Sequence, residues 1–244
     1  MGTSSSHRSP RTPAWDRVQR LYADPEAPPE AIVSGIVDAL TPTTREQMAD
    51  AAVARCMGTL TGASTGAIDA AQLSVSPALP ASWDLAAALR STAERSIIDA
   101  REASRFGEIA LDALSASALE VGQGADDTSE AVRAALARYA AERRLSELAG
   151  TFLAQDVSYA FRYFVERDLP AHVGGGRLGT VADAARLTSD ISAICEGTTR
   201  GLELGGLEDD LWRAADAGPA STSQYRGVLK TALGESLRAL GGIA

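Results

Sequence analysis

The chain has two places where residue types and spacing could do chemistry, and the first is a glycine-rich segment, residues 172–179. Its candidate ligand-contacting residues are His172, Gly174, Gly175, Gly176 and Arg177. Backbone amides in a glycine-rich loop and at a helix N-terminus can face a negative group, and an arginine adds a charge-assisted hydrogen bond. The segment is therefore a candidate binding loop for a small anion or a nucleotide.

A second interpretation of the same segment is a plain connection between two helices, with His172 hydrogen-bonded locally. A phosphate-binding loop of the common type follows a strand and carries Lys-Ser or Lys-Thr after its glycines, and this segment has neither feature. The sequence leaves both interpretations open.

The other chemical feature is the N-terminal segment 1–13, which is small, polar and basic, with His7, Arg8 and Arg11. A glycine at position 2 predicts removal of the initiator methionine, which exposes the Gly2 α-amine. An α-amine titrates near pH 8, about two units below a lysine, so an appreciable fraction is neutral and nucleophilic. Its Ser and Pro content predicts a flexible tail that can reach into another protein's cleft. An ordinary frayed terminus is the alternative.

Composition limits the classes of function. The 244 residues carry a net charge of −9, which disfavours direct binding to nucleic acid or to an anionic membrane. No apolar run is long enough to span a membrane. Cys56 and Cys195 fit buried, reduced thiols of a cytoplasmic protein, and neither has metal-ligand spacing around it. We expect no metal, no cofactor and no catalytic residues, so the chain is predicted to be non-enzymatic.

The elements that must position these residues are predicted to be helices only. Alanine is abundant, β-branched runs are few, and no alternating strand pattern occurs. The expected fold is all-α, an irregular bundle with two long central helices, in a single domain over residues 14–244 with a sub-boundary near 62–81. The expected helices are 14–23, 29–40, 45–61, 82–121, 129–168, 181–200, 207–215 and 221–240, with a loop over 62–80.

Three details of this pattern can be checked. The helix over 129–168 holds more than half of the Tyr and Phe residues, which predicts a central column packed in the core. Gly107 is a candidate point at which the first long helix bends or breaks. Thr180 and Asp183 have the spacing of a capping box, in which each side chain accepts a hydrogen bond from the other residue's backbone amide.

Two short stretches resemble the QatB family, a component of bacterial Qat anti-phage defence systems. One is the N-terminal Met1-Gly-Thr-Ser with the following Ser/Pro-rich stretch that ends in Pro13-Ala14-Trp15. The other is Phe164-Val-Glu-Arg-Asp-Leu-Pro-Ala-His-Val-Gly174. The chain lacks the longer Gly/Pro-rich spacer that is expected of this family.

The resemblance implies partners and a role. Qat systems combine such a protein with an ATPase, a QueC-like enzyme and a TatD-like nuclease. QueC enzymes adenylate a deazaguanine carboxylate, which ammonia then attacks. The resemblance therefore implies that Gly2 is the amine presented to the QueC-like partner, with Thr3 and Ser4 recognised in its cleft. The alternative function is a helical ligand-binding or regulatory domain that uses the loop over 172–179.

Overall fold

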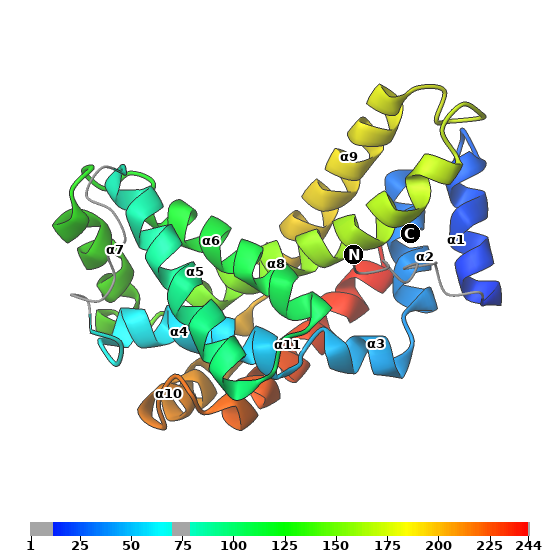
Figure 1. Cartoon of the computed structure of the whole chain (residues 1–244). Helices are drawn as coiled ribbons and strands as arrows, with labels where there is room; N and C mark the ends of the chain where they lie inside the picture. Colours follow the sequence, from blue (N-terminus) through cyan, green and yellow to red (C-terminus); the bar gives the residue numbers. More distant parts are fainter. Residues whose placement is uncertain (1–11, 70–78, 244) are drawn as a thin grey trace.

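The computed structural model describes residues 12–69 and 79–243, and within them there is no β-strand (Figure 1). The prediction of an all-α fold is confirmed. The α-helices are α1 (Pro13–Ala23), α2 (Pro29–Ala39), α3 (Pro42–Gln47), α4 (Ala51–Thr65), α5 (Ala81–Ala100), α6 (Arg105–Gly122), α7 (Ser129–Ala141), α8 (Leu145–Asp168), α9 (Val181–Arg200), α10 (Glu208–Asp216) and α11 (Thr222–Gly241). Two short 3-10 helices are η2 (Leu169–Ala171) and η3 (Leu204–Leu207).

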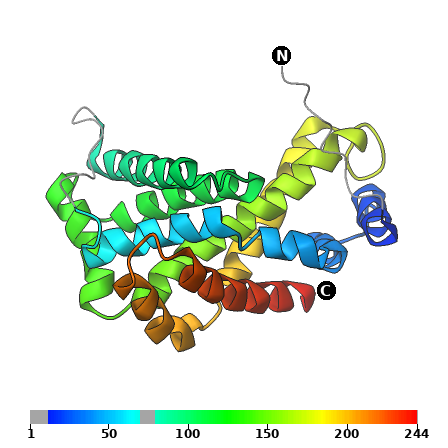
Figure 2. The same ribbon diagram turned by 60° about the horizontal axis from the view of Figure 1, so that its bottom comes forward.

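Helix α8 crosses the molecule and contacts most of the other long elements (Figure 1). It packs against α9 and α6, and α6 in turn packs against α5 and α4. Helices α5, α6 and α7 gather at one end of the molecule, and α1 and α2 stand at the other end, beside the C-terminal part of α8. Figure 2 brings forward the face formed by α10 and α11. The end of α8 is therefore the place where the N-terminal helices meet the body.

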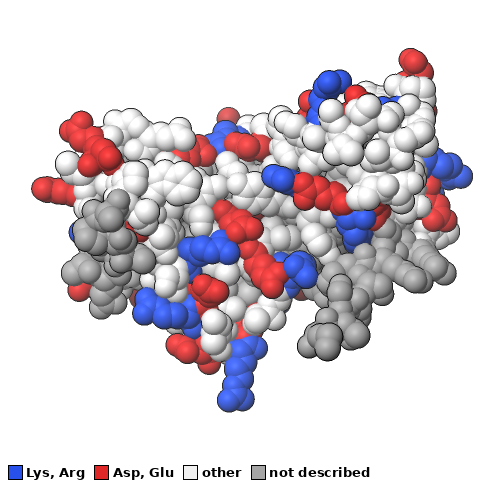
Figure 3. Space-filling model, turned by 45° about the horizontal axis from the view of Figure 1, so that its top comes forward, with Lys and Arg blue, Asp and Glu red and all other residues white. Residues whose placement is uncertain are grey.

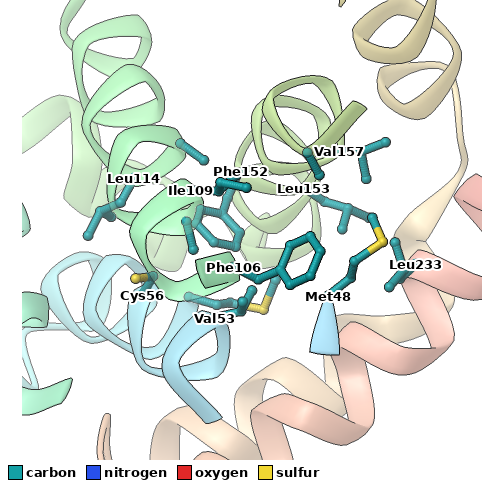
Figure 4. Close-up of a cluster of buried hydrophobic side chains, with 14 of the residues drawn as sticks. Met48, Val53, Cys56, Phe106, Ile109, Leu114, Phe152, Leu153, Val157 and Leu233 are labelled. Atoms are coloured by element: carbon teal, nitrogen blue, oxygen red, sulfur yellow. The ribbon is translucent and has the colours of Figure 1, made fainter. Parts of the chain in front are cut away.

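The centre of the core lies where α4, α6, α8 and α11 converge (Figure 4). Phe152 of α8 and Cys56 of α4 are completely buried there, and Phe106 of α6 is buried beside them. The predicted role of the aromatic residues in core packing is confirmed for Phe152, Phe161 and Phe164, which are all buried.

Gly107 is the third residue of α6, so the predicted helix breaks a few residues before it and not at Gly107 itself. A Cβ at Gly107 would overlap the Cβ of Ala52, which means that the glycine lets α6 and α4 approach closely. Close contact between helices at such a point requires small side chains on both sides. The residue therefore serves packing between α6 and α4.

Each of the two predicted long central helices is in fact a pair of helices. The first breaks at Arg101, whose φ of 57° is in the left-handed region, and α6 begins after Ser104. The Ser104 hydroxyl accepts a hydrogen bond from the Gly107 amide, which caps the new helix. The second breaks at Arg143, with a φ of 53°. Neither break contains a glycine or a proline, so the usual helix-breaking residues do not mark either of them.

The region around residue 50 also differs from the prediction. The helix expected over 45–61 is divided into α3 and α4, because the Asp50 side chain accepts two backbone hydrogen bonds and starts α4. Helix α4 continues to Thr65 and ends at Gly66, whose φ is 78°. The loop expected over 62–80 is thus partly helical, and the part over 70–78 lies outside the described residues.

The remaining helix predictions agree with the structure to within a few residues. Helices α1, α2, α9, α10 and α11 occupy the predicted ranges, and the capping box at the start of α9 is confirmed. None of the helices in the described parts of the chain is long and apolar enough to cross a membrane.

Candidate functional site

Trp15, near the start of the described chain, is in contact with the segment over 164–174 in the folded protein. Helix α1 begins at the end of the N-terminal stretch, and it lies beside the C-terminal end of α8, which begins the second stretch. We call the contact between them the α1 anchor and define it by Trp15, Tyr22, Phe164, Arg167 and Asp168. The α1 anchor fixes the position of the first helix on the body, and residues 1–11 are joined to that helix.

The centre of the α1 anchor is a carboxylate shared by an indole and a guanidinium. The Trp15 Nε1 donates a hydrogen bond to Asp168 Oδ2. The Arg167 Nε donates to Asp168 Oδ1 at 3.1 Å. The Asp168 side chain is 1% exposed and that of Arg167 is 13% exposed, so this ion pair is almost removed from water. A buried carboxylate that has lost its hydration needs such donors to remain charged.

Aromatic rings surround the guanidinium. The Arg167 Cζ lies 5.1 Å from the centre of the Trp15 ring and 5.7 Å from that of Phe164, both within the range of a cation–π interaction. The Trp15 and Phe164 ring centres are 6.1 Å apart in an edge-on arrangement. The Trp15 ring is thus contacted on its face by Arg167 and at its Nε1 by Asp168. Together these contacts fix the orientation of α1 against α8.

Tyr22 completes the α1 anchor near the C-terminal end of α1. Its hydroxyl is buried and has no hydrogen-bond partner among the described residues. Burial raises the pKa of this phenol well above its usual range, the Asp168 carboxylate raises it further, and Arg167 opposes the effect. The His172 ring packs against the Tyr22 ring with centres 5.7 Å apart. Tyr22 therefore stays neutral and acts through packing.

The predicted modification and recognition residues, Gly2, Thr3 and Ser4, lie outside the described residues. The nearest described residue is Thr12, the N-cap of α1, whose hydroxyl accepts a hydrogen bond from the Trp15 amide at 3.2 Å. Pro13 follows at the first helical position, where a missing amide hydrogen costs nothing. These local features start α1 at a defined residue next to the α1 anchor.

The glycine-rich segment folds back on itself and clasps the connection between α1 and α2. The Gly174 amide donates to the Leu178 carbonyl at 2.7 Å, and the Leu178 amide donates to the Gly175 carbonyl at 3.1 Å. Gly176 has a φ of 54°, and a Cβ there would overlap the Ala23 carbonyl oxygen. The Arg177 guanidinium donates to the Ala27 carbonyl. The structure brings the predicted loop residues together, but Arg177 is directed to the α1–α2 connection and two backbone amides of the segment are used within the segment itself.

The N-terminus of α9, which the sequence offered as an anion site, is occupied by a carboxylate of the chain itself. Asp183 Oδ2 accepts hydrogen bonds from the Thr180 amide at 2.9 Å and from the Thr180 hydroxyl at 2.7 Å. These hydrogen bonds lower the pKa of the Asp183 carboxyl, so it is charged at neutral pH. A negative group thus already sits where an external anion would bind. The geometry favours a structural role for the loop over 172–179.

Other chemically active groups are buried or scattered. Cys56 and Cys195 are buried, and burial raises the pKa of both thiols. No group of three or more His, Cys, Asp or Glu side chains that could hold a metal ion occurs among residues 12–69 and 79–243. Asp156 of α8 is buried, and one of its carboxylate oxygens has no hydrogen-bond partner among the described residues. Burial raises the pKa of this carboxyl, and the Asp50 carboxylate raises it further.

Sequence reasoning found Trp15 and the segment over 164–174 but missed that they meet. It also gave no role to the Arg167–Asp168 pair at the end of α8. The local signal was the adjacency of Arg167 and Asp168 at the end of α8. Arg and Asp side chains are seldom buried unless they are paired with an opposite charge. Comparison of the chain with protein-family models, with curated proteins and with solved structures gave no match.

Proposed function

We propose that this protein is a non-enzymatic, QatB-like component of an anti-phage defence system that presents its processed N-terminus to a QueC-like partner enzyme. The helical body carries the N-terminal segment, and the partner supplies the catalysis. Gly2 is the modified residue, and Thr3 and Ser4 are the residues that the partner's cleft recognises. An ATPase and a TatD-like nuclease of the same system are further partners, and the protein acts in the cytoplasm.

The observation that carries the proposal is the contact between the two resembling stretches. Trp15 from the first stretch packs against Phe164 and hydrogen-bonds Asp168 from the second, although 153 residues separate Trp15 from Asp168. The contact between the two stretches that carry the resemblance supports the proposal that they serve one purpose. That purpose would be a rigid attachment for the helix that follows residues 1–11, which supports a role for the N-terminus as the working part.

The proposed modification is an amide-forming acyl transfer. The partner uses ATP to convert the deazaguanine carboxylate into an acyl-adenylate and releases pyrophosphate. The neutral Gly2 amine then attacks the carbonyl carbon, a C–N bond forms, and the C–O bond to the phosphate breaks. AMP leaves with the electron pair, and the amine loses a proton. The amine is suited to this step because its pKa lies near physiological pH.

The test is to co-express the full chain with its QueC-like partner and to measure the intact mass and the mass of the N-terminal peptide. We expect loss of Met1 and addition of the deazaguanine acyl group on Gly2. An unmodified Gly2, under conditions in which the partner converts its small-molecule substrate, would falsify the proposal.

A pair of variants at position 2 separates processing from display. Gly2→Leu places a large residue behind Met1, so Met1 is retained and the displayed amine is displaced by one residue. We expect this variant to be unmodified. Gly2→Ala still allows removal of Met1 and is the matched control, for which we expect processing and at least partial modification. Equal modification of both variants would show that the partner does not read the N-terminus.

A further inference from the structure

A groove with a cationic rim lies between α11 and the α2–α3 segment, on elements separate from the α1 anchor. It has a volume of about 520 Å³. Its lining includes Val37, Arg45, Glu46, Lys230, Gly234 and Arg238. Three of these side chains are cationic and one is acidic, in a protein whose net charge is −9. On the face shown in Figure 3 acidic and basic side chains are interspersed, whereas the lining of this groove has an excess of positive charge.

Two cations of the groove, Lys230 and Arg238, lie on α11, and Arg226 lies on the same helix beside the groove. Lys230 Nζ pairs with Glu46 Oε2 at 2.7 Å, and Arg226 NH2 approaches the same oxygen at 4.0 Å. One carboxylate thus faces two cations. Arg238 is exposed, and no ion pair or hydrogen bond engages its guanidinium among the described residues. The span from Arg226 to Arg238 is about 18 Å along the helix axis. A small anion would contact one of these groups, whereas an elongated acidic partner contacts all of them.

Glycines give α11 a flat, exposed surface beside these cations. Gly227 and Gly234 are exposed and seven residues apart, so they share one face of the helix. A Cβ at either residue would meet nothing within 4 Å. A glycine inside an exposed helix costs about 1 kcal/mol relative to alanine, and no contact within the described chain requires glycine at these two positions. Small residues at a helix surface let a second helix approach closely.

Charge disfavours two candidate occupants of the groove, the N-terminal segment of this chain and a second copy of the chain. The N-terminal segment is basic, with His7, Arg8 and Arg11, and would be repelled. In an antiparallel pairing of α11 with α11 of a second copy, centred on Gly234, Lys230 of each copy would lie opposite Arg238 of the other. Like charges placed across an interface oppose binding.

We propose that this groove docks an acidic α-helix of a partner protein, with carboxylates along one face reaching Arg226, Lys230 and Arg238 and small residues over Gly234. The site is independent of the proposed function, because no residue of the α1 anchor contributes to it. Val37 and the buried Leu233 and Leu237 form the apolar floor beneath it.

The probe is a fluorescein-labelled, Ala-rich helical peptide of about 18 residues, with glutamates at every fourth position along one face. The control peptide has the same composition with its glutamates distributed around the helix. Fluorescence anisotropy with the full chain at low salt measures both affinities. We expect the one-faced peptide to bind at least about fivefold more tightly, which corresponds to about 1 kcal/mol.

Charge reversal tests the contacts. We expect Lys230→Glu/Arg238→Glu to weaken the binding of the one-faced peptide by about tenfold or more, as for the loss of well-placed charge pairs at an interface. Arg17→Glu/Arg95→Glu changes the net charge by the same amount at exposed positions on α1 and α5. We expect this control to change the affinity by less than about twofold. Equal effects of the two double variants would show that the peptide responds only to the net charge of the protein, and they would overturn the proposal.

Filling the groove tests its shape. Gly234→Leu places a side chain in the groove, and Gly197→Leu is its matched control, because Gly197 is also a helical glycine with nothing near its Cβ position. We expect weaker peptide binding only for Gly234→Leu, with unchanged circular dichroism. The proposal fails if pyrophosphate displaces the peptide while Gly234→Leu has no effect, because the site would then hold small anions. It also fails if sedimentation shows a dimer that the groove variants dissociate.

Discussion

The middle of α8, around Phe152, is enclosed by apolar side chains from several helices. Its C-terminal end, around Asp168, is held to α1 by an ion pair, an indole hydrogen bond and ring contacts. The first region gains its stability from many weak, non-directional contacts. The second depends on a few directional contacts that each need correct geometry. Small shifts of side chains in the body therefore cost little, because its contacts are non-directional. The attachment of α1 depends on directional contacts and has a single defined arrangement.

The largest effect is expected from the apolar region. Phe152→Ala removes a completely buried ring and should lower the free energy of unfolding by about 3–5 kcal/mol. Urea denaturation followed by circular dichroism measures this change, with Phe152→Leu as the conservative control. Because the core is shared by many helices, the loss should be global. A loss confined to α8 would contradict this view of the core.

The next effect concerns the α1 anchor. Asp168→Ala leaves the Arg167 guanidinium buried without its carboxylate and should destabilise the attachment of α1 by about 3 kcal/mol. Hydrogen exchange should become faster in α1 and remain slow in the core helices. Asp190→Ala, at an exposed position of α9, is the control. If α1 and the core lost protection together, the two regions would form one cooperative unit and the comparison would be wrong.

A third test uses a carboxyl that is fully buried among the apolar contacts, that of Asp156. Because burial raises the pKa of this group in the folded state, the folded chain keeps a proton that the unfolded chain releases above about pH 4. Its contribution to stability is therefore greatest at low pH and falls, by up to about 1.4 kcal/mol per pH unit, until the folded-state pKa is passed. The midpoints of urea denaturation, measured between pH 5 and pH 8, give the change of stability with pH.

The control for this slope is Asp156→Asn, which cannot titrate. We expect its stability to change less with pH than that of the wild-type chain. The partly exposed carboxyl of Asp183, whose pKa is lowered, contributes in the opposite direction in both proteins and cancels in the difference. Identical slopes would show that Asp156 keeps an ordinary pKa in the folded state.

The smallest effect is expected where the glycine-rich segment clasps the α1–α2 connection. Gly176→Ala forces a side chain into a left-handed backbone conformation and against the Ala23 carbonyl, at a cost of about 1–2 kcal/mol. Gly175→Ala, with open space around its Cβ position, is the control. Thermal unfolding compares the two variants. Equal melting temperatures would show that the clasp adds nothing to the anchoring of α1.

Much of the helical pattern could be predicted from the sequence because its causes are local. The capping box of Thr180 and Asp183 needs only two residues three positions apart. The apolar face of α1 needs only the spacing of Trp15, Val18 and Tyr22. The breaks at Arg101 and Arg143 could not be predicted in this way. Both put a non-glycine residue in a left-handed conformation, which such residues adopt rarely and which no local sequence pattern announces.

The candidate sites show the same division. The sequence pointed to Gly176 and Arg177, but their contacts with Ala23 and Ala27 depend on the path of the chain between them. It contained Lys230 and Arg238 without indicating that α2 and α3 would close a groove beside them.

The sequence by itself therefore determined that the chain is helical, where most helices begin, and that its N-terminal segment is basic and polar. Caps and apolar periodicity act between residues within about four positions of each other, so they can be read along the chain. Only the tertiary structure decided that Trp15 meets Asp168 across 153 residues and that the cations of α11 share a groove. Such contacts arise from how the helices pack, because packing brings together residues that no local pattern relates.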